Sequence, residues 1–131
     1  MITIHIDGAS RNNPGDAGVG IIAKDGEKVL FEIAEYIGKE TNNVAEYTAL
    51  IMGLKKAISK KILSADFFSD SQLIVEQIKG NYRVKDETLQ TLFHEAKGLI
   101  SKMKHFSISH VRREFNKEAD MLANNGIDSA I

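Results

Sequence analysis

The stretch ITIHIDGASRNNPGDAGVGII, residues 2–22, joins a strand-like alternation to a turn-rich loop and a second apolar run. Apolar and polar residues alternate over Ile2–Asp7, which predicts a strand. Asp7 ends this strand on its less apolar face, where a carboxylate is costly to bury unless another group compensates for its charge. The rest of the chain indicates what that group is.

The composition is typical of a globular protein and predicts a single domain over residues 1–131. The chain is 43% hydrophobic and 27% charged, which is enough to bury a core. It has no cysteine, so a metal ion would need oxygen or imidazole ligands. No apolar run reaches the roughly 20 residues of a membrane span, and no basic-then-apolar leader precedes the first strand, so we expect a cytoplasmic protein without a membrane partner. A monomer is the default expectation.

The net charge of −1 argues against binding nucleic acid by bulk electrostatic attraction. It leaves room for a local basic strip. A neutral enzyme or binding domain is the simplest interpretation of the composition alone.

The hydrophobic periodicity predicts the element order βββ-α-β-α-α-β-α. We expect strands over 2–7, 19–24, 28–37, 62–70 and 104–111, and helices over 41–61, 71–80, 85–103 and 116–126. Asp25-Gly26 favours a hairpin turn, Asn42 or Asn43 is the expected N-cap of the first helix, and Gly126 is the expected end of the last. Hairpins followed by crossovers predict an α/β fold, with a mixed five-stranded sheet flanked by helices.

Four acidic residues stand where this fold can bring them to one edge of the sheet. Asp7 and Asp70 each end a strand, and such ends form sites in α/β proteins. Glu46 lies in the first turn of a helix, on the same side as a stripe of small residues that permits close approach to the sheet. Asp120 lies on the last helix, one turn after Asn116.

Each acid also has an ordinary explanation when it is taken alone. A strand-end Asp often caps a loop, a first-turn Glu interacts with the helix dipole, and Asp120 fits a plain surface position. As a cluster, however, carboxylates repel one another unless cations neutralise them. Mg²⁺ prefers oxygen ligands, and two such ions roughly 4 Å apart suit the attack of water on a phosphodiester. The combination therefore predicts Asp7 as a shared metal ligand.

Four segments in order resemble type 1 ribonuclease H, and the resemblance covers almost the whole chain. They are DGASRNNPGDAGVG (7–20), TNNVAEYTAL (41–50), SDSQLIVEQIKG (69–80) and HVRREFNKEADMLAN (110–124). The resemblance implies the ribonuclease H-like fold and a metal-dependent endoribonuclease. Such an enzyme hydrolyses the RNA strand of RNA–DNA hybrids and leaves 3′-hydroxyl and 5′-phosphate ends. It also implies that the four acids hold two Mg²⁺ ions, for which Mn²⁺ is a possible substitute.

The resemblance also implies a set of substrate contacts. Three amide side chains match positions that contact the minor groove and its 2′-hydroxyl groups, which neutral amides can recognise. A threonine matches part of a pocket that holds a DNA phosphate. The residues assigned to substrate binding are Asn13, Thr41, Asn42, Gln72, Arg113 and Asn116.

The chain departs from many bacterial members at two places. The link GNYRVKDET (80–88) stands where they carry a basic, Trp-containing protrusion, which marks a short subgroup. Tyr82, Arg83 and Lys85 form either a small replacement patch or a mere connection, so we expect weaker and more salt-sensitive binding than in protrusion-bearing relatives. The loop before the last helix has no histidine. Arg113 matches an arginine of the short subgroup and is either an electrostatic contact or a surface residue, since arginine is no base near neutral pH.

Two alternatives stay open at this stage. Another nuclease of the same fold would also bring carboxylates to these strand ends, although the amide contacts to 2′-hydroxyl groups favour a hybrid. A non-catalytic or weakly active nucleic-acid-binding relative is disfavoured by the intact set of acids. The missing protrusion and loop histidine keep it possible.

Overall fold

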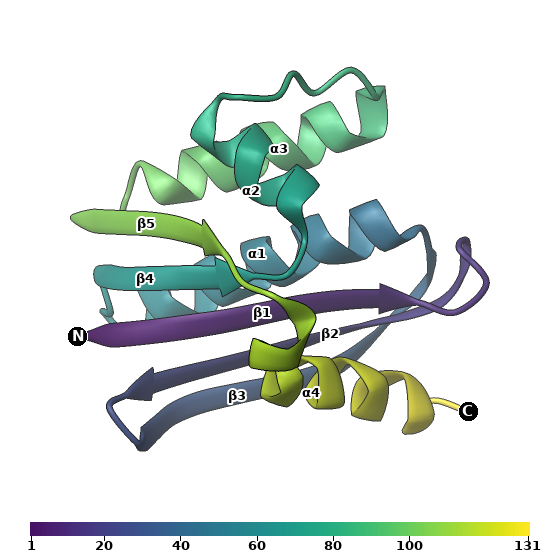
Figure 1. Ribbon diagram of the computed structural model, residues 1–131, viewed down its shortest axis with the longest axis horizontal. Helices are drawn as coiled ribbons and strands as arrows, with labels where there is room; N and C mark the ends of the chain where they lie inside the picture. The colour runs from purple at the N-terminus through teal and green to yellow at the C-terminus, as the bar shows by residue number, and fades with distance from the viewer.

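A computed structural model describes residues 1–131 and contains the predicted order of elements (Figure 1). The strands are β1 (Ile2–Ser10), β2 (Gly15–Asp25), β3 (Lys28–Glu40), β4 (Ser64–Ser69) and β5 (His105–His110). The helices are α1 (Asn42–Ser59), α2 (Gln72–Lys79), α3 (Glu87–Ile100) and α4 (Lys117–Asp128), with a 3₁₀ turn over Arg113–Phe115.

The strands form one mixed sheet in the order β3-β2-β1-β4-β5. The first three strands are antiparallel, and β4 runs parallel to both β1 and β5. The α/β prediction with a five-stranded sheet is confirmed. No helix has the length and apolar character that crossing a membrane requires.

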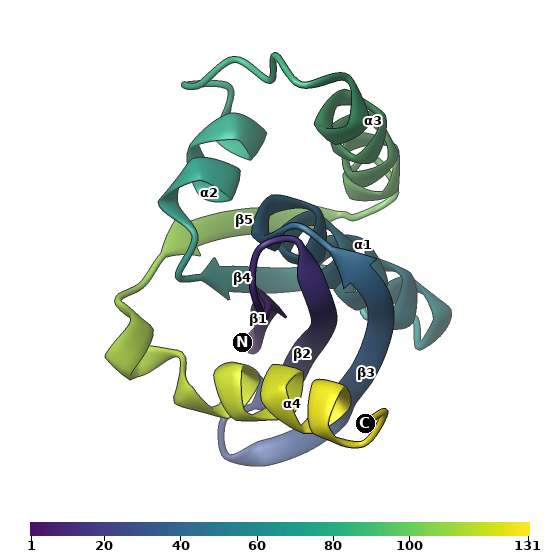
Figure 2. The same cartoon turned by 90° about the vertical axis from the view of Figure 1, so that its right-hand side faces the viewer.

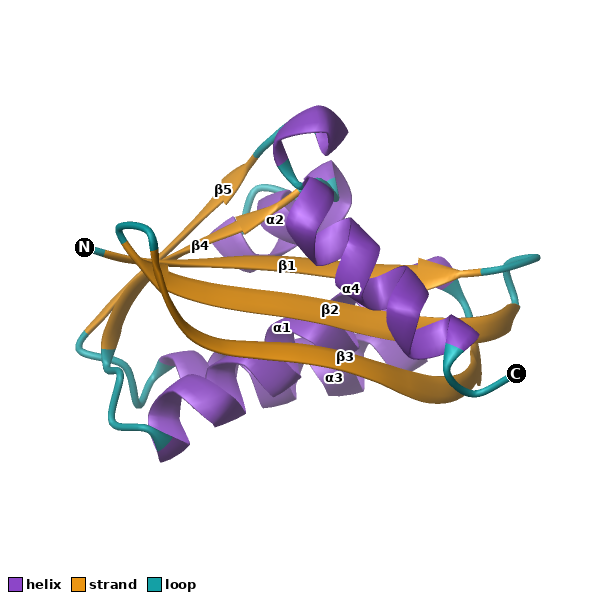
Figure 3. Cartoon of the chain, turned by 90° about the horizontal axis from the view of Figure 1, so that it is seen from below, coloured by secondary structure: helices purple, strands orange, loops and turns teal.

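Helices cover both faces of the sheet (Figures 2 and 3). Helix α4 lies on one face, and α1 lies on the other with α3 packed beyond it. The buried core includes Ile4 and Ile6 of β1, Phe67 of β4, and Tyr47 and Leu50 of α1. Strand β1 is the middle strand of the sheet and contacts α1 and α4.

The contact between α1 and β1 depends on a glycine. A Cβ at Gly8 would lie only 2.2 Å from the carbonyl carbon of Ala45. Because Gly8 has no side chain, the first turn of α1 rests directly on the strand backbone. The small residues Ala49 and Ala57 of the predicted stripe are fully buried, and a Cβ at Gly53 between them would touch Ile6 and Phe67.

Several element ends differ from the prediction. β1 continues to Ser10, because it keeps pairing with β2 after its pairing with β4 has ended. The N-cap of α1 is Thr41, whose Oγ1 accepts a hydrogen bond from the Val44 N–H at 3.2 Å, so the expectation of Asn42 or Asn43 was wrong.

The predicted end of the last helix at Gly126 was also wrong. Helix α4 continues to Asp128. A Cβ at Gly126 would lie 2.7 Å from the backbone nitrogen of Glu35 in β3. This glycine therefore permits close packing of α4 on the sheet and does not terminate the helix.

Candidate active site

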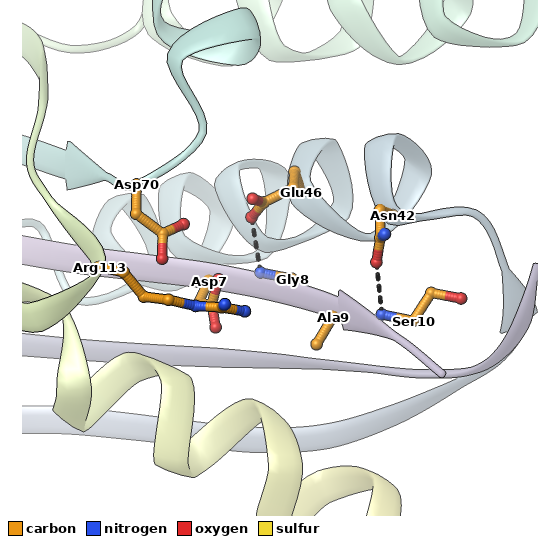
Figure 4. A pocket seen from close by; sticks show the side chains of 8 residues that line it. All are labelled: Asp7, Gly8, Ala9, Ser10, Asn42, Glu46, Asp70 and Arg113. Atoms are coloured by element: carbon orange, nitrogen blue, oxygen red, sulfur yellow. Dashed lines mark hydrogen bonds between the residues drawn. The ribbon is translucent and has the colours of Figure 1, made fainter. Parts of the chain in front are cut away.

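A polar cleft of about 450 Å³ opens beside β1, where the strand leaves β4. Figure 4 shows its side chains, which come from β1, the start of α1, the end of β4 and the loop before α4. The residues that line it are Asp7, Gly8, Ala9, Ser10, Asn42, Glu46, Asp70 and Arg113.

Two of its carboxylates are brought together by parallel strand pairing. Ile6 of β1 lies opposite Ser69 of β4, so the next residues, Asp7 and Asp70, emerge side by side. Asp7 is only 5% exposed, because β1 is the central strand and α4 covers this face.

The third carboxylate is fixed by a backbone donor. Glu46 lies just beyond the first turn of α1, where it was predicted, and accepts a hydrogen bond from the Gly8 N–H at 2.7 Å. This contact requires the close approach of helix and strand that Gly8 permits. Glu46 is 9% exposed, so its side chain has little freedom to turn away from the cleft.

Oxygen atoms of Asp7, Glu46 and Asp70 lie within 4.8 Å of one another. Oxygen ligands of one Mg²⁺ ion are about 3.0 Å apart when adjacent and about 4.2 Å apart when opposite, so the three groups lie near the spacing that a shared ion needs. The donors are all carboxylates, which suits a hard cation. The residues present therefore fit a divalent metal ion.

The electrostatics of the cleft also favour a cation. Burial, followed by the charges of Glu46 and Asp70, raises the pKa of Asp7 to about 9. Burial and the charge of Asp70 raise the pKa of Glu46 to about 8. The pKa of Asp70 is also raised, mainly by burial. The ionised cluster thus needs positive charge for its stabilisation.

Asp120 lies beside this cluster but outside the group of three. It is half-buried on α4, and its charge contributes to the raised pKa values of Asp7 and Asp70. The structure thus brings all four predicted acids to the same region of the molecule. Three of them have oxygen atoms close enough to one another to share a metal ion.

Arg113 supplies positive charge from the 3₁₀ turn. Its side chain points into the cleft (Figure 4). The guanidinium favours the ionised forms of Asp70 and Glu46, because its positive charge offsets part of the rise in the pKa of both. The position agrees with the predicted electrostatic contact better than with a plain surface arginine.

Asn13 and Asn42 form part of a continuous set of hydrogen bonds at the mouth of the cleft. The Asn42 Oδ1 accepts from the Ser10 N–H at 2.8 Å, and the Asn13 Oδ1 accepts from the Asn42 N–H at 2.9 Å. Each amide therefore uses its oxygen inside the fold. The NH₂ groups are left as free donors, since no hydrogen bond within the chain engages them.

The other predicted substrate residues lie in three different settings. Thr41 lines a neighbouring pocket of about 490 Å³. Gln72 is exposed at the start of α2. Asn116 is 1% exposed and donates from Nδ2 to the Ile6 carbonyl at 2.9 Å, which anchors the start of α4 to β1. Asn116 is therefore buried and does not line the carboxylate cleft, so its position does not support the predicted substrate contact.

Gly8 and Ser10 also line the cleft, although neither was predicted as a site residue. Both act through backbone N–H groups, which hold Glu46 and Asn42 in place. The Asp7-Gly8 pair at the end of an apolar strand was the available signal, since a glycine there permits close approach of another backbone.

The short link after α2 is ordered by amide side chains. Gln77 Nε2 donates to the Arg83 carbonyl at 3.4 Å, and Gln90 Nε2 donates to the Val84 carbonyl at 3.0 Å. Tyr82 is 47% exposed, and Arg83 is exposed without an ion pair. None of the link residues lines the carboxylate cleft.

Comparisons with known proteins agree on one family. The model for reverse transcriptase-like proteins matches residues 5–126. The bifunctional protein Rv2228c of Mycobacterium tuberculosis is 41% identical over 131 residues, which cover 98% of this chain and 36% of that protein. Ribonuclease HI of Halobacterium salinarum is 39% identical over 127 residues, which cover 96% of this chain and 64% of that protein. The chain thus spans less than two thirds of the length of these relatives.

A solved structure shows the same architecture. LC11-RNase H1 in complex with an RNA/DNA hybrid matches with a TM-score of 0.93 and 38% identity, covering 99% of each chain. The likeness includes every element of the sheet and its helices.

Proposed function

Since this chain belongs to the ribonuclease H family, we propose that it is a metal-dependent endoribonuclease that hydrolyses the RNA strand of RNA–DNA hybrids. The expected products carry 3′-hydroxyl and 5′-phosphate ends. One observation carries the proposal: three carboxylate groups from separate elements lie within 4.8 Å of one another in an open cleft. Such a cluster is costly without a cation, and a fold that keeps it has use for one.

Asp7, Glu46, Asp70 and Asp120 are the residues that would hold two divalent ions. Mg²⁺ suits this site because it takes a few carboxylate ligands, keeps several waters and shares substrate phosphates. A pair of bound ions supplies an activated water molecule and neutralises charge at a phosphodiester. The protein orients the donors: β1 and β4 fix the two aspartates, and the Gly8 N–H fixes Glu46.

Arg113 would attract the substrate backbone into the cleft. Its guanidinium can pair with a phosphate through two parallel hydrogen bonds. It stays charged near neutral pH and therefore does not act as a base. The residue supports binding and charge neutralisation.

Asn13 and Asn42 would recognise the minor groove as donors. Because their oxygens accept backbone N–H groups, their NH₂ groups face outward. A hybrid offers 2′-hydroxyl oxygens and base acceptors in a wide, shallow minor groove. Gln72 extends this surface. Thr41 lines the adjacent pocket, and its hydroxyl would be a donor for a DNA phosphate there. The monomeric state, the cytoplasmic location and the single-domain boundary stay predictions.

The test is a cleavage assay on end-labelled hybrid, RNA duplex and DNA duplex, with and without Mg²⁺. We expect cleavage of the RNA strand of the hybrid alone, only with the metal, and its loss in Asp70→Asn. Asp25→Asn is the matched control, because Asp25 is 59% exposed and pairs with Ile2 at the opposite end of β1. Hybrid binding without cleavage would support a non-catalytic relative, and equal cutting of DNA duplex would indicate another nuclease of this fold.

A further inference from the structure

Two residues outside the proposed metal ligands hold Asp120. Asn124, one turn further along α4, donates from Nδ2 to the Asp120 carbonyl oxygen at 3.0 Å and to its Oδ1 at 3.5 Å. Arg11, in the loop between β1 and β2, donates from Nη2 to the Asn124 Oδ1 at 3.2 Å. These contacts connect the loop to the carboxylate that lies outside the group of three.

The chemistry of the pair fixes the orientation of the amide. Arginine has donors only, so the Asn124 oxygen must face Arg11. The NH₂ group then faces Asp120, with its shorter hydrogen bond to the backbone carbonyl and its longer one to the carboxylate. Without the guanidinium, the amide oxygen loses its partner, and the Asn124 side chain is held only from the Asp120 side.

Arg11 is itself held in place on α4. Its Nη1 lies 2.8 Å from the Asp128 Oδ1, and Asp128 and Asn124 are one turn apart on the same face of the helix. The Arg11 backbone N–H donates to the Asp16 carbonyl at 2.9 Å, which closes the loop. The guanidinium therefore sits between two side chains of α4 with a defined position.

We propose that Arg11 and Asn124 are positioning residues for Asp120, and this proposal rests on the proposed function. Arg11 sets the orientation of the Asn124 amide, and Asn124 directs the Asp120 carboxylate toward the other three acids. Arg11 precedes Asn13 in the same loop, and Asn13 contacts the start of α1. The loop that meets the substrate thus also sets the fourth metal ligand.

The experiment compares Asn124→Ala, Arg11→Met and the double variant with wild type. The matched control is Asn125→Ala, since Asn125 is exposed on the same helix. Mg²⁺ is titrated into each protein alone and followed by NMR chemical shifts, and kcat and KM are measured separately on a hybrid. We expect Asn124→Ala to weaken Mg²⁺ binding about tenfold, the lower end of the effect of residues that orient metal ligands.

The kinetic constants and the double variant distinguish a positioning role from a role in substrate binding. Asn124→Ala should lower kcat and leave KM nearly unchanged, and Asn125→Ala should match wild type in every measurement. Arg11→Met should act in the same direction, and the double variant should be no worse than Asn124→Ala, because both residues act through one amide.

Three results would overturn the proposal: an Asn124→Ala protein that binds Mg²⁺ like the Asn125→Ala control, effects of the two single variants that add, or a loss confined to KM. If Asn124→Ala does not fold, Arg11→Met decides the question, since the Arg11 side chain is 39% exposed in a loop. A wild-type protein that binds Mg²⁺ without cleaving a hybrid refutes the proposed function, whereas the metal titration still tests the positioning.

Discussion

Gly8→Ala should damage both stability and activity, because the position has no room for a methyl group. A Cβ there would lie 2.2 Å from the Ala45 carbonyl carbon and 2.4 Å from the Glu46 nitrogen. These are backbone atoms, which cannot rotate out of the way. An ordinary carbon contact is about 3.5 Å, so the first turn of α1 must withdraw from β1 by roughly 1.3 Å.

The energetic cost follows from this displacement. Forcing extra volume into a packed core costs about 1–3 kcal/mol. The 2.7 Å hydrogen bond from the Gly8 N–H to Glu46 would also be lost, which costs about 1.5–3 kcal/mol in the Mg²⁺-bound protein, where Glu46 is charged. The sum is a large share of the roughly 5–15 kcal/mol that stabilises a domain, and predicts a fall in Tm of about 10 °C or more. Displacing Glu46 by about 1 Å should lower kcat on the order of a hundredfold.

The assay is thermal unfolding followed by circular dichroism, together with initial rates on a hybrid at a temperature where the variant is folded. Gly98→Ala is the control, because a Cβ there meets no atom within 4 Å. It should leave the rate unchanged and stabilise α3 by up to about 1 kcal/mol, since alanine favours a helix. The steric reasoning is wrong if Gly8→Ala unfolds within 2–3 °C of wild type, a window of under about 1 kcal/mol, and cleaves normally.

Three further predictions follow from the site. In metal-free protein, burial and neighbouring carboxylates raise the pKa of Asp7 to about 9 and that of Glu46 to about 8, so the folded state keeps protons that the unfolded chain releases near pH 4. For each retained proton, the free energy of unfolding falls by about 1.4 kcal/mol for every unit by which the pH rises. The metal-free Tm should therefore fall between pH 5 and 8, and saturating Mg²⁺ should remove most of that slope; a flat metal-free Tm contradicts this. Asn42→Asp keeps the oxygen that accepts from Ser10 but replaces the outward donor with a negative charge, so fluorescence anisotropy should show weaker hybrid binding while Tm stays unchanged. Because the basic protrusion is absent, fewer ionic contacts to phosphates form, so hybrid affinity at 50 mM salt should be lower than that of a protrusion-bearing relative, and equal affinities would count against it.

The sheet order and the acidic edge could be predicted because local patterns determine them. Alternation and helical periodicity identify the elements, and hairpin and crossover lengths limit how they connect. A parallel strand pair brings equivalent ends to one edge, so Asp7 and Asp70 were expected to meet if their strands were neighbours. The pairing of Ile6 with Ser69 is what satisfies that condition.

The exact ends of the elements depend on contacts that the sequence does not show. Asn42 is a good N-cap by type, but its side chain accepts a hydrogen bond from Ser10, 32 residues earlier, and Thr41 caps the helix in its place. Gly126 is a common helix terminator, yet here it lies within α4 because Glu35 of β3 packs against it. In both cases a distant partner overrides the local preference.

The position of the carboxylates in the cleft explains how a stable fold can contain a cluster of acidic residues. Burial makes ionised Asp7 and Glu46 costly, yet the same burial holds their oxygens in place without relying on flexible loops. Arg113 offsets part of the negative charge, and it does so from an exposed turn that leaves the carboxylates free for other ligands. The strands and α1 hold the carboxylates together despite their mutual repulsion. A cation that neutralises this repulsion therefore binds more tightly, because the ligands are already in place before it binds. The central position of β1 in the sheet is therefore as necessary to the chemistry as the carboxylates that it carries.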